Sequence, residues 1–360
     1  MVDDKKASPT ANGSKPVGTA TSSEDKFRGY STEDFSHESF SVVEYDDDQA
    51  EPQQDDNAPK TQVFSCPVDH DGTSVFVKCW FNPNATKPPI IIAHGLGESV
   101  SQYRTFAAAL HKLGFNVFSF DMRGHGRSGA MLGHVGDFKN LVSDILQVVS
   151  WVRFKSNRKK PYVIAQGIGA LTLLYFAKQY PGYIAGAVMV SPLLLEQRLK
   201  VPAKVLIRSM AELFPNLRLP RKFTPTFLLF GPDGMSTTTT QQKLGYFGIT
   251  SIFAREILNA LQGAQSLLNT YKLPTLFLCP TKDDVCDYEM LEEIIEKNGN
   301  NSLFELKKVE RENHYLLRGE EADVQPVLEV IVDWLNKKSA GNAGAGSAVR
   351  DSMQAYKDAE

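Results

Sequence analysis

The 360-residue chain lacks several features that mark particular protein classes. Its four cysteines show no Cys-x-x-Cys spacing, which predicts reduced thiols in a cytoplasmic protein rather than a disulfide framework. They are Cys66, Cys79, Cys279 and Cys286. No apolar run reaches the roughly 18 residues of a membrane span. The N-terminal MVDDKKASPT has no apolar segment typical of a secretory signal, and Val2 stands where myristoylation needs glycine.

The chain also lacks a strong charge of either sign. Its formal net charge is −3, so no global positive field attracts nucleic acid, and we expect no nucleic-acid partner. No cluster of His, Cys, Asp or Glu has the spacing of metal ligands, so we expect neither a metal nor another cofactor.

Composition divides the chain into three parts. Residues 1–57 are rich in Ser, Asp, Glu, Gly, Pro and Gln, which predicts a disordered acidic tail. Residues 339–360, beginning SAGNAGAGSAVR, are typical of a flexible C-terminal tail. Between them, hydrophobic residues are frequent enough for one domain with a sizeable core over 58–338.

Within that domain, short apolar runs alternate with helical patterns. The expected strands are TQVFSC, TSVFVKCW, PPIIIA, FNVFSFD, YVIAQ, IAGAVMVS, PTLFLC and SLFELKKV. The expected helices include YRTFAAALHKLG, DFKNLVSDILQVVSWVRF, GALTLLYFAKQYP, MLEEIIEKNG and VQPVLEVIVDWLNKK. This alternation predicts an α/β fold with a mostly parallel sheet and helices on both faces. Ligands bind such sheets beyond the carboxyl ends of the strands.

Residues 193–270 interrupt the alternation with a helical insertion that is too long for an ordinary loop. It is either a surface excursion or a lid over the active site. One set of its apolar residues recurs at helical spacing beside Lys200, Lys204 and Arg208. These residues either pack on the core or form an interfacial helix at a membrane. They are Val201, Val205, Leu206, Met210, Leu213 and Phe214.

Four motifs carry residues suited to chemistry. HGLGES (94–99) follows an apolar strand, and its glycines let backbone N–H groups approach a ligand. AQGIGA (165–170) lies between a strand and a helix, the context of the nucleophile elbow. KDDVCDY and ENHYLL follow the last two expected strands.

Together with DMRGHGRSG (121–129), these motifs resemble the monoacylglycerol lipase and lysophospholipase branch of the α/β-hydrolases, also labelled serine aminopeptidase S33. The resemblance covers about residues 60–338. It implies the α/β-hydrolase fold with a helical cap and hydrolysis of acyl esters in lipid metabolism. A small acyl-lipid ligand is therefore expected, with peripheral membrane contact through the cap as a further expectation.

The resemblance also implies residue roles. The acid matches Asp283, with Asp284 as the alternative, and the base matches His314. The Leu96 and Ile168 N–H groups match the oxyanion donors. Without a nucleophile, the Asp283–His314 pair could equally serve only as a structural hydrogen bond.

The chain departs from the family pattern at the nucleophile elbow, where the family typically has the sequence Gly-His-Ser-Met-Gly. This chain has Ala165, Gln166, Gly167, Ile168 and Gly169 there. Gly167 stands at the nucleophile position and cannot form an acyl-enzyme. Three hypotheses follow: a hydrolase with degraded activity, including an inactivated variant of an active lipase; a pseudoenzyme that binds an acyl lipid or partner; or hydrolysis by a water that His314 activates. Changes at Ala165 and Gln166 favour natural drift over an engineered knockout.

Two further segments have less specific patterns. His125 and Arg127 resemble catalytic residues by type, but the surrounding glycines favour a structural loop. The basic run RFKSNRKK (153–160) is either a solvated connector or a docking patch for anionic lipid.

Overall fold

The computed structural model describes residues 71–194, 201–219, 248–283, 285–297, 303–312 and 314–340, together with the backbone of 61–67. All of them fall within one unit of the chain, Glu38–Glu360. The expected N-terminal tail, most of the expected C-terminal tail, the centre of the insertion and Asp284 lie outside the described residues.

Eight strands form one sheet in the order β1-β2-β4-β3-β5-β6-β7-β8. Their bounds are β1 Thr61–Pro67, β2 Ser74–Trp80, β3 Ile90–Ala93, β4 Val117–Phe120, β5 Tyr162–Gln166, β6 Gly186–Val190, β7 Thr275–Pro280 and β8 Phe304–Val309. β2 runs antiparallel to β1 and β4, and every pair from β4 to β8 is parallel. The prediction of a mostly parallel α/β sheet is confirmed.

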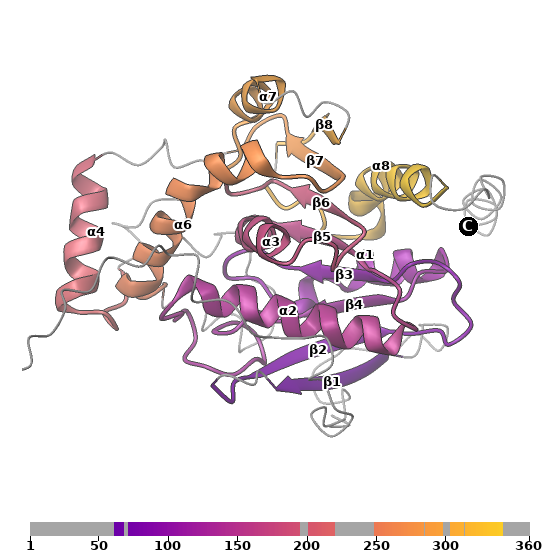
Figure 1. Ribbon diagram of the computed structural model, residues 1–360, viewed down its shortest axis with the longest axis horizontal. Helices are drawn as coiled ribbons and strands as arrows, with labels where there is room; N and C mark the ends of the chain where they lie inside the picture. Colours follow the sequence, from indigo (N-terminus) through magenta and orange to yellow (C-terminus); the bar gives the residue numbers. More distant parts are fainter. Residues whose placement is uncertain are drawn as a thin grey trace, which may run out of the picture. The chain divides into compact units, whose positions relative to one another are not determined.

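Helices cover both faces of this sheet (Figure 1). Their bounds are η4 Val100–Tyr103, α1 Arg104–Lys112, α2 Phe138–Lys155, α3 Ile168–Gln179, α4 Val201–Leu213, α6 Ser251–Thr270, α7 Tyr288–Lys297 and α8 Glu321–Ala340. Asp137 caps α2 by accepting the Lys139 N–H at 2.8 Å, which satisfies one of the unpaired donors at a helix start. None of the described helices is long and apolar enough to cross a membrane.

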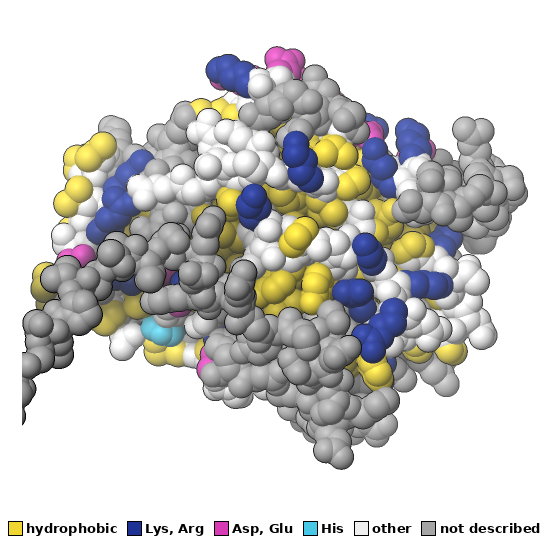
Figure 2. Space-filling view, in the orientation of Figure 1, with side chains coloured by type: hydrophobic (Ala, Val, Ile, Leu, Met, Phe, Trp, Pro, Cys, Tyr) yellow, Lys and Arg dark blue, Asp and Glu magenta, His cyan; other side chains and the backbone are white. Residues whose placement is uncertain are grey.

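Helices α4 and α6 lie between β6 and β7, where the sequence predicts an insertion. α4 packs on α6 through the buried side chains Ile207 and Ala211. The sequence left two interpretations of the six apolar residues at 201–214, and packing on the core does not hold for five of them, which are 56–71% exposed. They are Val201, Val205, Leu206, Leu213 and Phe214. Hydrophobic side chains lie at the surface over α4 (Figure 2). Helical spacing identifies an apolar face but cannot show whether a neighbour covers it.

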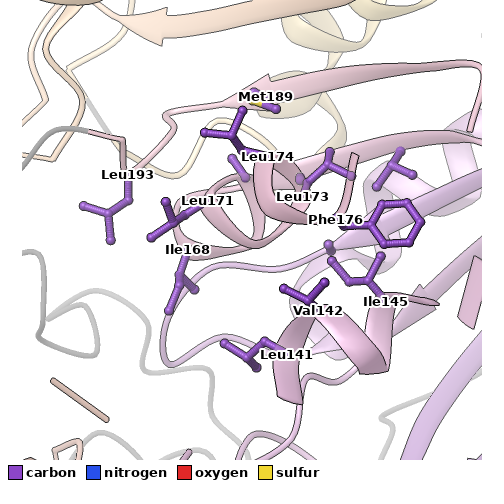
Figure 3. Close-up of a cluster of buried hydrophobic side chains, with 14 of the residues drawn as sticks. Leu141, Val142, Ile145, Ile168, Leu171, Leu173, Leu174, Phe176, Met189 and Leu193 are labelled. Carbon is purple, nitrogen blue, oxygen red and sulfur yellow. The ribbon is translucent and has the colours of Figure 1, made fainter. Parts of the chain in front are cut away.

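The core divides into two layers because successive strand residues point to opposite faces of the sheet. In β3, Ile91 and Ala93 belong to the layer under α2 and α3, whereas Ile90 and Ile92 belong to the layer under α1 and α8. Figure 3 shows the first layer, where side chains of α2 and α3 interdigitate. Both faces of β3 are therefore buried. This burial fixes the position at the sheet edge where the loop after Ala93 begins.

Candidate active site

The four motifs meet at one edge of the sheet. Because parallel strands share a direction, their carboxyl ends lie together, and Ala93 at the end of β3 pairs with Ala165 near the end of β5. The loop 94–99 follows β3, and Gly167 follows β5. Asp283 and His314 follow β7 and β8. Residues more than 200 positions apart in the sequence are thus neighbours in space.

Gly167 forms the sharp turn between β5 and α3. Its φ of 54° and ψ of −117° lie outside the regions that residues with side chains commonly occupy. The turn is held by the Gly167 N–H, which donates to the Val190 carbonyl at 3.2 Å, and by the Gly167 carbonyl, which accepts the Leu193 N–H at 3.1 Å. Ile168 is the first residue of α3, so its N–H lies at the positive end of the helix dipole.

A side chain at position 167 would face His314. A Cβ built on Gly167 lies 3.6 Å from His314 Nε2 and 3.6 Å from Gly95 Cα, both ordinary contact distances. The position therefore accommodates a small side chain in space, and the obstacle to one is the backbone conformation.

Gly169 is fixed by close packing. A Cβ there would come within 2.7 Å of the carbonyl oxygens of both Ala93 and His94. The first turn of α3 consequently lies against the end of β3 and the start of the loop that carries Leu96. This contact gives a physical reason for the one elbow residue that agrees with the family pattern.

His314 and Asp283 form a direct pair. His314 Nδ1 lies 3.0 and 2.9 Å from the two carboxylate oxygens of Asp283, whose side chain is buried. Asp283 also accepts the Val285 N–H at 2.7 Å, so its position is fixed by the backbone. With Nδ1–H donating to the carboxylate, Nε2 is the atom that faces Gly167. The structure thus brings together Gly167, Asp283 and His314.

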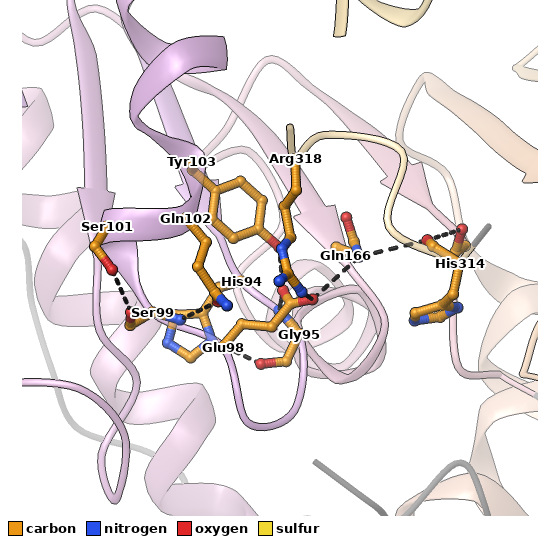
Figure 4. Close-up of polar contacts among 11 residues, drawn as sticks. His94, Gly95, Glu98, Ser99, Ser101, Gln102, Tyr103, Gln166, His314 and Arg318 are labelled. Atoms are coloured by element: carbon orange, nitrogen blue, oxygen red, sulfur yellow. Dashed lines mark hydrogen bonds and ion pairs between the residues drawn. The ribbon is translucent and has the colours of Figure 1, made fainter. Parts of the chain in front are cut away.

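Glu98 supports the loop that carries Leu96, and we did not predict this role from the sequence. Its Oε2 accepts the Gly95 N–H at 2.7 Å and the Tyr103 hydroxyl, and its Oε1 lies 3.3 Å from Arg318 Nη1 (Figure 4). Burial and the Glu98 charge raise the pKa of Tyr103 well above its ordinary value, so its hydroxyl remains a donor. A buried carboxylate requires such partners, and here they hold Gly95 in place.

Gln166 links this carboxylate to the base. Its Nε2 lies 3.3 Å from Glu98 Oε1 and 3.5 Å from the His314 carbonyl oxygen (Figure 4). The Ser191 hydroxyl donates to the same carbonyl at 2.8 Å. The side chain that replaces the family's histidine therefore ties the backbone of His314 to the elbow.

Two buried histidines complete the support of the site. Burial lowers the pKa of His94 to about 3 and that of His125 to about 4, so both rings are neutral at pH 7. His94 Nε2 accepts the Met122 N–H at 2.8 Å, which leaves Nδ1–H to donate to the Gly95 carbonyl at 2.7 Å. His125 Nδ1 lies 3.1 Å from the Arg123 carbonyl, and the Arg127 guanidinium lies over the Phe76 ring. These contacts hold the loop 121–129 against the site.

The described cysteines are free and buried: Cys79, Cys279 and Cys286. Cys286 Sγ lies 2.9 Å from Cys279 Sγ, and this hydrogen bond together with burial raises the pKa of the Cys286 thiol. Within the described part of the chain, no three His, Cys, Asp or Glu side chains are grouped as metal ligands.

Several known proteins are similar to this chain in sequence or in fold. A family model described as serine aminopeptidase, S33, matches residues 84–321. The monoglyceride lipase of Mus musculus is 27% identical over 284 residues, which are 78% of this chain and 92% of that protein. The monoglyceride lipase homolog of monkeypox virus is 23% identical and matches over 75% of this chain and 97% of its own length.

Solved structures agree at the level of the fold. A monoacylglycerol lipase from Paleococcus ferrophilus superposes with a TM-score of 0.57 at 22% identity, over 70% of this chain and 96% of its own. A soluble variant of the Saccharomyces cerevisiae monoglyceride lipase, solved with a substrate analog, gives a TM-score of 0.60 at 17% identity, over 78% and 96%.

Proposed function

This chain belongs to the serine aminopeptidase S33 family, as a monoglyceride lipase-like hydrolase by sequence, and we propose that it binds a monoacyl lipid without serine-based turnover. The observation that carries the proposal is Gly167, which faces His314 Nε2 but offers no hydroxyl. Acyl transfer in serine hydrolases begins when a hydroxyl attacks the ester carbonyl, and glycine cannot do this.

The other parts of the reaction centre support ligand binding. We assign His314 as the base, Asp283 as the group that orients it, and the Leu96 and Ile168 N–H groups as donors to the ester carbonyl oxygen. A bound ester carbonyl would accept hydrogen bonds from these N–H groups without being attacked. The retained pair and donors therefore favour recognition of an acyl group over a purely structural use of the fold.

Apolar side chains surround the elbow on the side of the cap. Ile168, Leu193 and Leu194 belong to the same buried cluster as Ile207 of α4 and Phe253 of α6. An acyl chain extending from the elbow would meet hydrocarbon surface there, as lipid sites require. The mouse and yeast relatives are named monoglyceride lipases, which suggests a monoacylglycerol or the fatty acid derived from it as the ligand.

Binding is tested by thermal unfolding with 1-O-alkylglycerols, which cannot be hydrolysed, below their aggregation concentration. A ligand present at about 100 times its Kd stabilises the folded state by about 2.7 kcal/mol, which raises the melting temperature by several degrees. We expect a shift that grows with alkyl length and no shift with glycerol. Absence of a shift at every chain length would contradict lipid binding.

Turnover is tested in the same preparation with a fluorophosphonate probe and a p-nitrophenyl ester. We expect no labelling and no turnover above background. Ester turnover that disappears in His314→Ala, still without labelling, would instead assign water-mediated hydrolysis, since His314 Nε2 faces the open position at Gly167.

We further propose that the exposed apolar face of α4 contacts a membrane surface. Val205, Leu206 and Phe214 are exposed on α4 and the segment that follows it, and Lys204 and Arg208 lie on the same helix. Apolar residues flanked by basic ones favour insertion at the headgroup level.

Co-sedimentation with phosphatidylcholine vesicles should fall at least about tenfold in Leu206→Asp/Phe214→Asp, because two charges would enter that interface. The control Gln265→Glu/Asn269→Asp adds the same charge to exposed positions of α6, and equal loss in both variants would refute the assignment.

A further inference from the structure

One stretch of the described chain has charge of a single sign. Residues 145–194 contain no Asp or Glu and six Lys or Arg, although the whole chain carries a formal net charge of −3. We call these six the basic surface: Arg153, Lys155, Arg158, Lys159, Lys160 and Lys178. All are exposed except Arg153, which is half-buried.

The backbone gathers five of these six residues at the C-terminal end of α2, and Lys178 lies in the last turn of α3. The helix ends at Lys155, and Asn157 and Arg158 both adopt positive φ, of 51° and 63°. The Arg158 N–H donates back to the Arg153 carbonyl at 2.7 Å, so the chain reverses tightly and the charged side chains stay close together. Figure 2 shows Lys and Arg side chains grouped over this end of α2. Their positive charge is also favourable beside the negative end of the helix dipole.

The opposite charge is concentrated just before β1. Residues 29–59 contain ten Asp or Glu and no Lys or Arg. Seven of the ten fall within 44–56, the segment EYDDDQAEPQQDD. Only residues 57–60 separate this acidic segment from Thr61, the first residue of β1.

The pairing register places the start of β1 at the same edge of the sheet as the basic surface. Consecutive pairs across β1, β2, β4, β3 and β5 form one row that ends at Tyr162, two residues after Lys160. The row is Thr61, Trp80, Val117, Ile90 and Tyr162. α2 also packs against β1 (Figure 1). This edge is opposite to the one that carries the candidate active site.

The distances are within reach of the chain. Four strand spacings of about 4.8 Å separate the ends of that row, or about 19 Å in all. An extended chain spans about 3.3–3.6 Å per residue, so residues 44–60 cover that distance with room to lie along the surface. Because the linker to β1 is so short, the effective concentration of the acidic segment at the basic surface is about 1 mM or more.

We propose that the acidic segment 44–56 docks on the basic surface. The interaction is electrostatic and intramolecular, and it covers a surface that would otherwise attract anionic lipid or another polyanion. It does not depend on the proposed lipid binding, because the two sites lie at opposite edges of the sheet.

The test is zero-length carbodiimide cross-linking of the full chain, followed by mass spectrometry of the peptides. Carboxylates of 44–56 should couple to Lys155, Lys159 and Lys160 at least about fivefold more than to remote exposed lysines. This excess should vanish in about 1 M salt, because the Debye length there is about 3 Å and the attraction is screened. The remote lysines for comparison are Lys282, Lys297 and Lys337. An even distribution over all exposed lysines overturns the proposal.

Charge reversal supplies the matched control. Arg158→Glu/Lys160→Glu should reduce coupling to Lys155 and Lys159 at least about threefold, whereas Lys282→Glu/Lys297→Glu reverses the same charge elsewhere and should not. Undiminished coupling in the first variant overturns the proposal.

Vesicle binding gives a second test. In the full chain carrying Asp46→Asn/Asp47→Asn/Asp48→Asn, binding to phosphatidylserine vesicles should increase. Vesicle binding that is strong and equal with and without these substitutions would show that lipid, not the segment, occupies the surface.

Discussion

Replacing Gly167 with serine is expected to raise hydrolysis of a short-chain p-nitrophenyl ester on the order of 10³-fold over the Gly167→Ala variant. The Cβ would lie 3.6 Å from His314 Nε2, so the attached hydroxyl is within hydrogen-bonding reach of the base in a suitable rotamer. His314 is already oriented by Asp283 at 2.9 Å. The nucleophile would therefore complete an arrangement whose other members are present.

The same substitution is expected to lower the free energy of unfolding by about 1–3 kcal/mol. At φ 54° and ψ −117°, glycine has little steric penalty, whereas any side chain strains the backbone. Gly167→Ala isolates this cost, since it adds the Cβ without the nucleophile. Urea denaturation should show a similar loss of stability for the alanine and serine variants, and the ester assay should separate them.

Activity should remain below that of a native lipase because of Gln166. Its amide lies 3.3 Å from Glu98 Oε1 and 3.5 Å from the His314 carbonyl, contacts that fix the backbone rather than serve the reaction. His314→Ala in the serine background should abolish the gain. A serine variant that is fully stable and inert would show that the assignment of the nucleophile position is wrong.

Much of the fold could be predicted from local patterns. Strand YVIAQ is β5 residue for residue, because a short, wholly buried strand is bounded by Pro161 and the elbow glycine. The neighbourhood of Gly167, Asp283 and His314 also follows from sequence, once parallel strands place their carboxyl ends at one edge.

Other parts of the site could not be predicted. Arg318 and Glu98 are 220 residues apart, and only the completed sheet brings them within 3.3 Å. Ser191 reaches the His314 carbonyl from a positive φ of 42°, which its sequence context does not indicate. The exposure of Leu206 could not be decided from the sequence for a related reason, since an apolar helical face has the same spacing whether it is covered or not.

Replacing Asp144 with alanine is expected to lower the free energy of unfolding by about 3–5 kcal/mol. Asp144 lies in α2 with a fully buried side chain, and its two oxygens accept from Arg123 Nη2 at 2.6 Å and Nε at 2.7 Å. Arg123 belongs to the loop 121–129, whose Met122 N–H donates to His94. The pair therefore anchors the loop that supports the candidate active site.

The size of the effect comes from the charge left behind. Burial alone would lower the pKa of Arg123. The hydrogen bonds and charges of Asp144 and Asp71 outweigh burial and raise the pKa above its ordinary value, so the guanidinium stays charged. Without Asp144, its remaining ion-pair partner among the described residues is Asp71, at 2.6 Å and one-third exposed. Solvent reaches the Asp71 carboxylate and weakens this pair, so Asp71 compensates only in part for the loss of Asp144.

Two variants distinguish this explanation from a simple loss of contacts. Asp71→Ala should cost about 1 kcal/mol or less, because solvent can replace the exposed partner. Arg123→Met/Asp144→Leu should recover most of the stability lost in Asp144→Ala, since no unpaired buried charge remains. Urea denaturation of the three variants at pH 7 measures these differences. Equal losses in Asp71→Ala and Asp144→Ala, or no recovery in the double variant, would mean that the buried charge is not the cause.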